Sequence, residues 1–241
     1  MALNLCIDIG NSRIKMALFE NDVLIQFSVF EHNDEPKIKE WLANKSISKG
    51  IYSSVIKANP AWLYSIHQKD KLIKLDSNIK TPLKNHYKTP LSLGTDRVAA
   101  MVGAISQFPS ENLLVVNAGS CVTFDLVDKN HVFIGGNIAP GLGMRWKAMH
   151  QFTANLPRVL NLDSDLGFLG NTTMSALHNG GFQGIVMEIE GYFDRLKQDN
   201  ADLKCIITGG TAPFLVNQLK IDNFAEPYLV LKGLNNILNY Q

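Results

Sequence analysis

The chain carries one strand-turn-strand pattern twice. Alternating apolar residues lead into the turn at Asp8 to Ser12 near the N-terminus, and again into the turn at Asn117 to Cys121 in the middle of the chain. The two copies are offset by 109 residues, whether counted from position 8 to 117 or from position 10 to 119. This repetition indicates one ancestral unit used twice. Two glycine turns that face each other would hold a polyanionic ligand, and a nucleotide polyphosphate is the natural candidate.

Each copy opens a three-strand meander and continues through alternating helices and strands. The first meander is predicted over Leu3–Ile9, Ile14–Phe19 and Val23–Val29, and the second over Leu113–Val116, Val122–Val127 and Val132–Ile134, where Gly135 and Gly136 end it. Helical spacing follows from Thr95 to before Pro109, and residues 172–197 read as two helices broken at Gly180 and Gly181. These patterns predict a duplicated α/β fold with halves 1–110 and 111–241 and an interdomain cleft.

The charge balance and the cysteine content limit which kinds of partner are expected. Lys plus Arg number 23 and Asp plus Glu number 22, with no basic run, so neither nucleic acid nor a membrane surface is expected as a partner. The three cysteines lie far apart in apolar segments and are expected to be reduced packing residues. No stretch reaches the length of a membrane span. We expect a cytoplasmic protein that binds small molecules.

The two turns have the chemistry of a phosphate site. Glycine lets backbone N–H groups approach an anion, and side-chain donors are available on Asn11, Ser12, Ser120 and Thr123. Lys15 would add positive charge. Asp8 is itself an anion, so its expected role is to hold a hydrated Mg²⁺ that bridges to the phosphates. The alternative is that the Asx residues only stabilise a hairpin.

A third motif lies between the two turns. Proline and turn residues make residues 81–93 a loop, and such loops often line sites. Thr95 follows it at the start of the predicted helix and is expected to cap the first turn. Asp96 either caps this helix or acts as a base toward a hydroxyl group. The forked guanidinium of Arg97 is suited to binding a carboxylate.

Together these motifs resemble those of type III pantothenate kinases, members of the acetate and sugar kinase, Hsp70 and actin superfamily. The resemblance rests on residues 8–12 with Lys15, residues 94–97, and residues 117–120 with Thr123 and Asp125. Supporting matches are Asn85, Tyr87, Pro90, Gly135, Gly136, residues 139–141, Thr173 and residues 208–210. The resemblance implies two ribonuclease H-like, actin-like ATPase halves.

The resemblance implies transfer of the ATP γ-phosphoryl group to the 4′-hydroxyl of pantothenate, the first step of coenzyme A biosynthesis. Asp96 would be the catalytic base, although the helix dipole and Arg97 are expected to keep it ionised and weakly basic. ATP and phosphate binding would involve Asp8, Ile9, Gly10, Asn11, Ser12, Arg13, Ile14, Lys15, Gly119 and Ser120. Substrate binding would involve Tyr87, Gly94, Thr95, Asp96, Arg97 and Thr173.

Two positions depart from the family pattern. Asn117 stands where an aspartate associated with a monovalent cation is common, so binding of K⁺ or NH₄⁺ is expected to weaken or vanish. Ser120 replaces a common threonine and keeps the hydroxyl. The apolar residues within 172–197, together with the resemblance, predict a homodimer. A non-catalytic nucleotide-binding regulator on the same scaffold, or a kinase for another small hydroxy acid, are the alternative functions.

Overall fold

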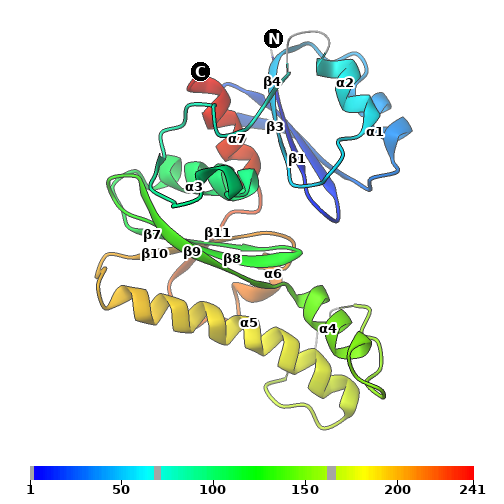
Figure 1. The fold of residues 1–241 in the computed structure, drawn as a ribbon, viewed down its shortest axis with the longest axis vertical. Helices are drawn as coiled ribbons and strands as arrows, with labels where there is room; N and C mark the ends of the chain where they lie inside the picture. Colours follow the sequence, from blue (N-terminus) through cyan, green and yellow to red (C-terminus); the bar gives the residue numbers. More distant parts are fainter. Residues whose placement is uncertain (1–2, 68–71, 162–166) are drawn as a thin grey trace. The chain divides into compact units, whose positions relative to one another are not determined.

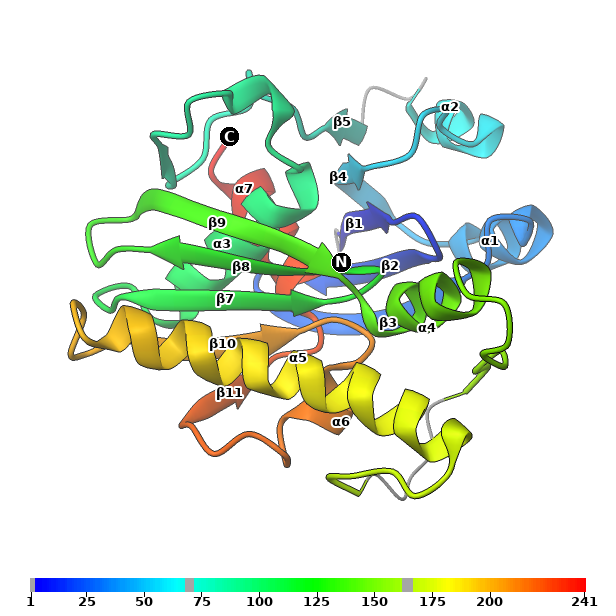
Figure 2. The same cartoon turned by 60° about the horizontal axis from the view of Figure 1, so that its bottom comes forward.

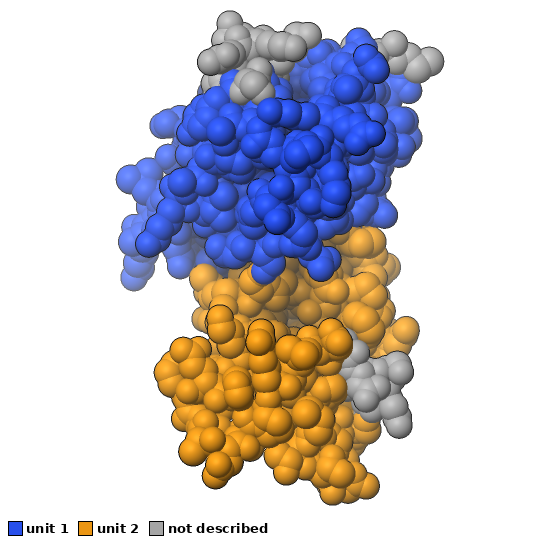
Figure 3. All heavy atoms as spheres, turned by 90° about the vertical axis from the view of Figure 1, so that its right-hand side faces the viewer, with its two compact units in different colours: residues 1–110, 127–135, 228–241 blue, residues 111–126, 136–227 orange. Residues whose placement is uncertain are grey.

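The structure is a computed structural model that describes residues 3–67, 72–161 and 167–241 (Figure 1). Its contacts divide the chain into two compact units, coloured separately in Figure 3. Unit 1 comprises residues 1–110, 127–135 and 228–241, and unit 2 comprises residues 111–126 and 136–227. Residues 127–135 and the C-terminal segment thus group with the first 110 residues of the chain.

Unit 1 is built on a five-stranded sheet. Strands β1 (Leu3–Ile9), β2 (Ile14–Glu20) and β3 (Val23–Phe30) form the predicted antiparallel meander. Strands β4 (Ile47–Ser54) and β5 (Leu72–Lys74) extend it in parallel, giving the order β3-β2-β1-β4-β5. Because β1, β4 and β5 are parallel, their carboxyl ends lie at one edge of the sheet, where ligands bind in many α/β proteins.

Helices cover both faces of this sheet (Figure 1). Helices α1 (Glu35–Leu42) and α2 (Ala61–His67) pack on one face through Ile38, Trp62 and Leu63. Helices α3 (Thr95–Gln107) and α7 (Leu229–Asn239) pack against each other on the opposite side. Their backbones approach so closely that a Cβ on Gly233 would lie 1.8 Å from the carbonyl oxygen of Ala99, so this crossing requires glycine.

The second sheet has the strand order β11-β10-β7-β8-β9-β6. It comprises β6 (Lys84–Asn85), β7 (Leu113–Ala118), β8 (Cys121–Val127), β9 (Val132–Pro140), β10 (Lys204–Thr208) and β11 (Asn223–Ala225). Within unit 2, helix α5 (Thr173–Lys197) runs along one face of the sheet (Figure 2). The shorter helices are α4 (Leu142–Gln151) and α6 (Ala212–Leu215). Buried side chains of α5 and β7, β8 and β10 form the core of this unit.

Two sequence-based predictions of element boundaries are wrong. Strand β9 does not end at Gly135 but runs through to Pro140. Helix α5 is not broken at Gly180 and Gly181 but is continuous from Thr173 to Lys197. A Cβ on Gly181 would lie 2.5 Å from Nε1 of Trp146, so this glycine serves close packing against α4 rather than a helix end.

The apolar residues of α5 do not form a free surface. Phe182, Ile185 and Ile189 are fully buried in the unit 2 core, and Val186 and Phe193 are nearly so. These residues therefore give no support to the predicted homodimer, since they fill the core of their own unit. Cys6 and Cys205 are likewise buried. Among the described residues, no helix has the length and apolar character that a membrane crossing requires.

Candidate active site

The first glycine turn joins β1 to β2. The Gly10 N–H donates to the Arg13 carbonyl oxygen at 3.0 Å, and this bond closes the turn between the buried residues Ile9 and Ile14. Residues 11–13 are exposed. The Arg13 guanidinium pairs with the Glu31 carboxylate at 3.3 Å. The turn thus presents backbone and polar side chains to solvent from a rigid two-strand base.

Asp8 is a buried carboxylate at the end of β1. Asp8 is only 7 % exposed, and it pairs with Lys15 between the antiparallel strands β1 and β2. The Lys15 Nζ atom is 3.9 Å from Asp8 Oδ2. Burial raises the pKa of Asp8 to about 6, Lys15 lowers this pKa, and the nearby charge of Asp96 raises it. The end of β1 and the start of α3 therefore bring two carboxylates and one ammonium group together.

The start of α3 is held against the end of β4. Gly94, not Thr95, is the N-cap residue, so the predicted capping role of Thr95 is wrong. The Thr95 hydroxyl instead forms a 2.8 Å hydrogen bond with the Ser53 hydroxyl on β4. The Arg97 N–H donates to Asp96 Oδ1 at 2.9 Å. A Cβ on Gly94 would lie 2.6 Å from that same oxygen, so glycine is required for this placement of the carboxylate.

Asp96 has a raised rather than a lowered pKa. Burial is the largest cause and raises the pKa, whereas the Arg97 N–H, the Arg97 charge and Lys15 lower it. The helix start and Arg97 were expected to lower the pKa of Asp96 and make it a weak base. This expectation is wrong, because the pKa is raised overall. Loss of hydration outweighs the stabilising neighbours, and this makes Asp96 better suited to accept a proton.

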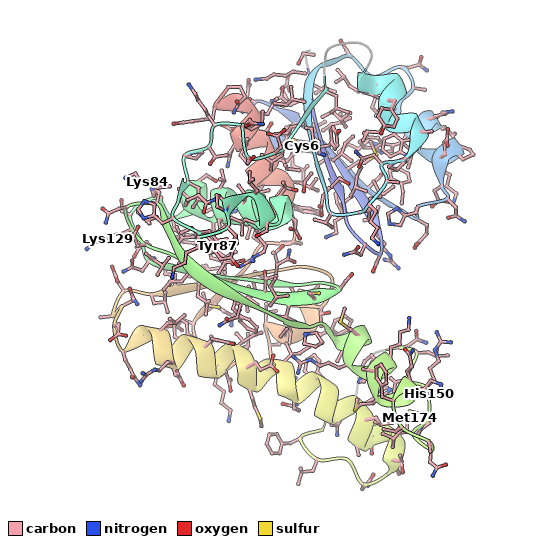
Figure 4. The ribbon with its side chains drawn as sticks, in the orientation of Figure 1. Cys6, Lys84, Tyr87, Lys129, His150 and Met174 are labelled. Carbon is pink, nitrogen blue, oxygen red and sulfur yellow. The ribbon has the colours of Figure 1, made fainter. Side chains whose placement is uncertain are left out.

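Arg97 is a buried cation next to two aromatic rings. The residue is 4 % exposed, and its Cζ atom lies 5.9 Å from the Tyr87 ring centroid and 5.7 Å from that of Phe133. Tyr87 lies beside α3 in Figure 4. The predicted substrate residues Tyr87 and Arg97 are thus in contact. Phe133 was not among the predicted residues, because an isolated phenylalanine in a strand carries no local signal of a site.

A cavity of about 570 Å³ lies within unit 1, beyond the ends of β4 and β5. Residues 81–93, predicted to be a site-lining loop, supply much of its wall, together with Gly94 and Thr95. Its apolar lining includes Val55, Leu75 and Val98. Tyr87, Asp96 and Arg97 do not line it, so the cavity meets the predicted substrate motif only at its first two residues.

The second glycine turn joins β7 to β8 in unit 2. The Gly119 N–H donates to the Cys121 carbonyl oxygen at 2.8 Å, and the Gly141 N–H donates to the Ser120 carbonyl oxygen at 3.1 Å. Gly209, with φ of 98°, packs against this turn, since a Cβ there would lie 2.5 Å from the Ala118 carbonyl oxygen. Unit 2 therefore brings together the turns at 117–120, 139–141 and 208–211.

Three predicted contacts of unit 2 differ in accessibility. Ser120 and Thr173 are exposed, whereas Thr123 is only 7 % exposed. Among the described residues, the Thr123 hydroxyl has no hydrogen-bond partner and is shielded from solvent, so it is not presented to a phosphate. Asn117 pairs with Thr208 across β7 and β10 and is partly exposed beside Gly119.

The raised pKa of Asp8 predicts that the Asp8→Asn variant is the more stable protein at pH 7.5 in the absence of ligands. The pKa is about 6 in the folded state and ~3.9 in an unfolded chain, so the folded state binds the proton more tightly. This contribution to stability is full below ~pH 4 and is lost as the pH rises through about 6. The shift corresponds to about 3 kcal/mol at most.

Urea unfolding at several pH values measures this effect. We expect the difference in unfolding free energy between Asp8→Asn and the wild type to grow from ~pH 4 to ~pH 7. Asp34→Asn is the control, because the hydrogen bond from Lys37 lowers the pKa of Asp34 and the sign of its effect is reversed. A wild type that is more stable than Asp8→Asn at pH 7.5 would contradict the prediction.

Two units that each open with a strand-turn-strand pattern define an actin-like ATPase fold. Two carboxylates lie at the end of β1 and the start of α3. Comparison with solved structures supports the fold. The glucokinase of an Antarctic psychrotroph matches with a TM-score of 0.55 at 12% identity over 100% of both chains. At this level of identity the likeness concerns the fold alone.

The chain belongs to the type III pantothenate kinase family. The family model for type III pantothenate kinase matches residues 4–195. The type III pantothenate kinase of Bacteroides fragilis is 40% identical over 240 residues, which cover 99% of this chain and 98% of that protein. A Campylobacter jejuni structure assigned to the Baf family of transcriptional activators matches at 27% identity, with a TM-score of 0.63 over 98% of both chains. The predicted family, fold class and kinase activity are thereby confirmed.

Proposed function

We propose that the chain transfers the γ-phosphoryl group of ATP to the 4′-hydroxyl of pantothenate, giving 4′-phosphopantothenate. The class of reaction follows from family membership. The roles of individual residues are assigned from one observation. In unit 1, Asp8, Lys15 and Asp96 are grouped with the buried guanidinium of Arg97. These side chains provide charge for the phosphates, a proton acceptor for the hydroxyl and a cation for the acceptor carboxylate.

Asp96 accepts the proton of the acceptor hydroxyl and aims its oxygen at the phosphorus. The transition state of phosphoryl transfer is loose, so the nucleophile needs orientation more than early deprotonation. The desolvated carboxylate of Asp96, held by the Arg97 N–H, provides both a fixed direction and a raised proton affinity. Arg97 binds the acceptor carboxylate with Tyr87 beside it, and Thr173 is a further proposed contact from unit 2.

The phosphate groups of ATP are bound by the two glycine turns. In the first turn, Gly10, Asn11 and Ser12 offer donors and Lys15 offers a charge, while Ile9, Arg13 and Ile14 frame the turn. In the second turn, Gly119 and Ser120 do the same. We propose that both turns bind one triphosphate, as the duplication of the motif suggests.

The residues at the end of β1 fit a Mg²⁺ ion. Asp8 and Asp96 are close enough to raise the pKa of Asp8 by repulsion, and a cation next to them relieves this cost. One carboxylate that works with substrate phosphates is a common way of holding Mg²⁺. When bound, the ion neutralises charge on the transferring phosphoryl group. Asp8 would hold the ion and would have to be ionised to do so.

The cavity of unit 1 is proposed to admit the branched apolar end of the acceptor. Its volume of about 570 Å³ is within the range of small-molecule sites. Val55, Leu75 and Val98 form an apolar wall next to Gly94 and Thr95. This wall suits a group that carries methyl substituents beside the reacting hydroxyl.

A monovalent cation is not required in this proposal. Asn117 keeps an oxygen ligand but lacks the charge of an aspartate, so any K⁺ or NH₄⁺ would be bound weakly. Because Asn117 lacks one charged ligand, we expect turnover to depend little on K⁺. Replacing K⁺ with a large organic cation should change turnover by less than about threefold.

ATP turnover measured with and without pantothenate tests the proposed reaction. We expect ADP release that depends on pantothenate and an equal amount of phosphorylated product. The alternative, a non-catalytic regulator, is not favoured by family membership. Calorimetry that shows nucleotide binding, together with an absence of turnover, would support it. Faster turnover of pantetheine or a simple sugar than of pantothenate would identify a kinase for another acceptor.

We further propose that the protein is a cytoplasmic homodimer. The support is family membership and the exposed apolar side chains that unit 2 carries outside its core, among them Ile138, Met144 and Met187, which are 62 %, 46 % and 51 % exposed. Light scattering at micromolar concentration should give twice the chain mass of 26.7 kDa. A mass of one chain under these conditions would exclude the dimer.

A further inference from the structure

Phe133 and Tyr87 both contact the Arg97 guanidinium. Its Cζ atom lies 5.7 Å from the Phe133 centroid and 5.9 Å from the Tyr87 centroid. The two rings are 5.5 Å apart and tilted by 31°. Both distances are within the range in which a ring quadrupole attracts a cation. We call these three residues the aromatic clamp.

A strand pairing that is remote in sequence builds the clamp. The two residues of β6 pair in parallel with the start of β9, which places Asn85 opposite Phe133. The Lys84 N–H donates to the His131 carbonyl oxygen at 2.8 Å and extends this pairing. The Asn85 side chain then accepts the Tyr87 N–H at 2.9 Å, which turns the chain so that Tyr87 meets Phe133. All of these residues belong to unit 1.

Burial makes the clamp effective. Phe133 is fully buried and Arg97 is 4 % exposed, so the guanidinium lies in a poorly hydrated place where contact with a ring face is strongest. A free arginine side chain has many rotamers, and fixing it on binding would weaken affinity. Contact with the two rings restricts the guanidinium before the ligand arrives, so less conformational freedom is lost on binding.

We propose that Phe133 is a positioning residue that sets the preference of the enzyme for acceptors that carry a carboxylate. Phe133 acts through Arg97, holding the guanidinium so that its N–H groups meet the carboxylate in a bidentate manner. This inference rests on the proposed function, in which Arg97 binds the acceptor carboxylate. It assigns to β9 a part in substrate selection.

The test compares two acceptors with wild-type protein and Phe133→Leu. The acceptors are pantothenate and its alcohol analogue, in which a hydroxymethyl group replaces the carboxylate. Leucine keeps an apolar side chain but removes the ring face. We expect KM for pantothenate to rise about tenfold, with kcat and KM for ATP within about threefold of the wild type. KM for the alcohol analogue should change by less than about threefold, because it has no carboxylate for Arg97 to bind.

Two further variants separate positioning from a general loss of packing. Phe193→Leu is the matched control, because Phe193 is also a buried ring beneath a cation, Lys197, but it lies in α5 outside the site. It should leave both KM values unchanged. Phe133→Met removes the ring with another flexible apolar side chain and repeats the test if the leucine variant does not fold. Far-ultraviolet circular dichroism reports folding of each protein.

The outcomes distinguish this inference from the proposed function. If the wild type does not phosphorylate pantothenate, the proposed function fails. If the wild type is active and loss of the Phe133 ring weakens both acceptors equally, or neither, Phe133 does not act through the carboxylate and the inference is overturned. Selective weakening of pantothenate supports it.

Discussion

Asp96→Asn is expected to lower kcat for pantothenate phosphorylation by about 10²- to 10⁴-fold, the usual contribution of a positioned general base. Asparagine has nearly the same shape and can still accept the Arg97 N–H that Asp96 Oδ1 accepts at 2.9 Å. It cannot accept the proton of the acceptor hydroxyl. A coupled assay of ADP release at saturating substrates measures the effect, and KM for ATP should change little.

The fold should survive this substitution, since burial raises the pKa of Asp96 and the neutral amide removes that cost of ionisation. Asp202→Asn is a suitable control, because Asp202 accepts a hydrogen bond from Asn112 in unit 2 and has no proposed part in the reaction. It should retain wild-type kcat. Turnover of Asp96→Asn equal to that of the wild type would remove Asp96 from the role of base.

Arg97→Lys is expected to raise KM for pantothenate by about 10- to 100-fold, the effect of losing a charge-assisted hydrogen bond. Lysine keeps the positive charge but has neither the planar fork nor the flat face that contacts Tyr87 and Phe133. Steady-state kinetics with varied pantothenate at saturating ATP measure the change.

The control for Arg97→Lys is the same exchange at Arg195, which bonds Gln198 at the end of α5 and is outside the site. Arg195→Lys should not alter KM for either substrate. If Arg97→Lys bound pantothenate as tightly as the wild type, the carboxylate would have to be recognised elsewhere.

Local patterns in the sequence were sufficient for the two strand-turn-strand units and for the start of α3. Alternation of apolar residues around Gly10 and Gly119 depends only on neighbours in sequence, so both strand-turn-strand units were predicted. The continuity of α5 was not predictable, because Gly181 is retained for contact with Trp146, which is distant in sequence. The short strand β6 exists only through its pairing with β9.

The sequence pointed to the residue types of the proposed site but not to their electrostatics. Aspartate and arginine after Gly94 indicated a base and a carboxylate partner. The pKa of Asp96 depends on burial, which arises from tertiary packing, whereas its sequence neighbours are the groups that lower this pKa, so the predicted direction was wrong. The role of Phe133 was not predicted because it also depends on tertiary packing. Its contact with Arg97 results from the pairing of β6 with β9.

A crystal structure with a non-hydrolysable ATP analogue, Mg²⁺ and pantothenate tests the central claim most directly. We predict that the turns containing Gly10 and Gly119 contact the same triphosphate, and that the Asp96 carboxylate lies within hydrogen-bond distance of the 4′-hydroxyl. A complex in which the two turns contact different molecules, or in which Asp96 points away from the hydroxyl, would contradict the account.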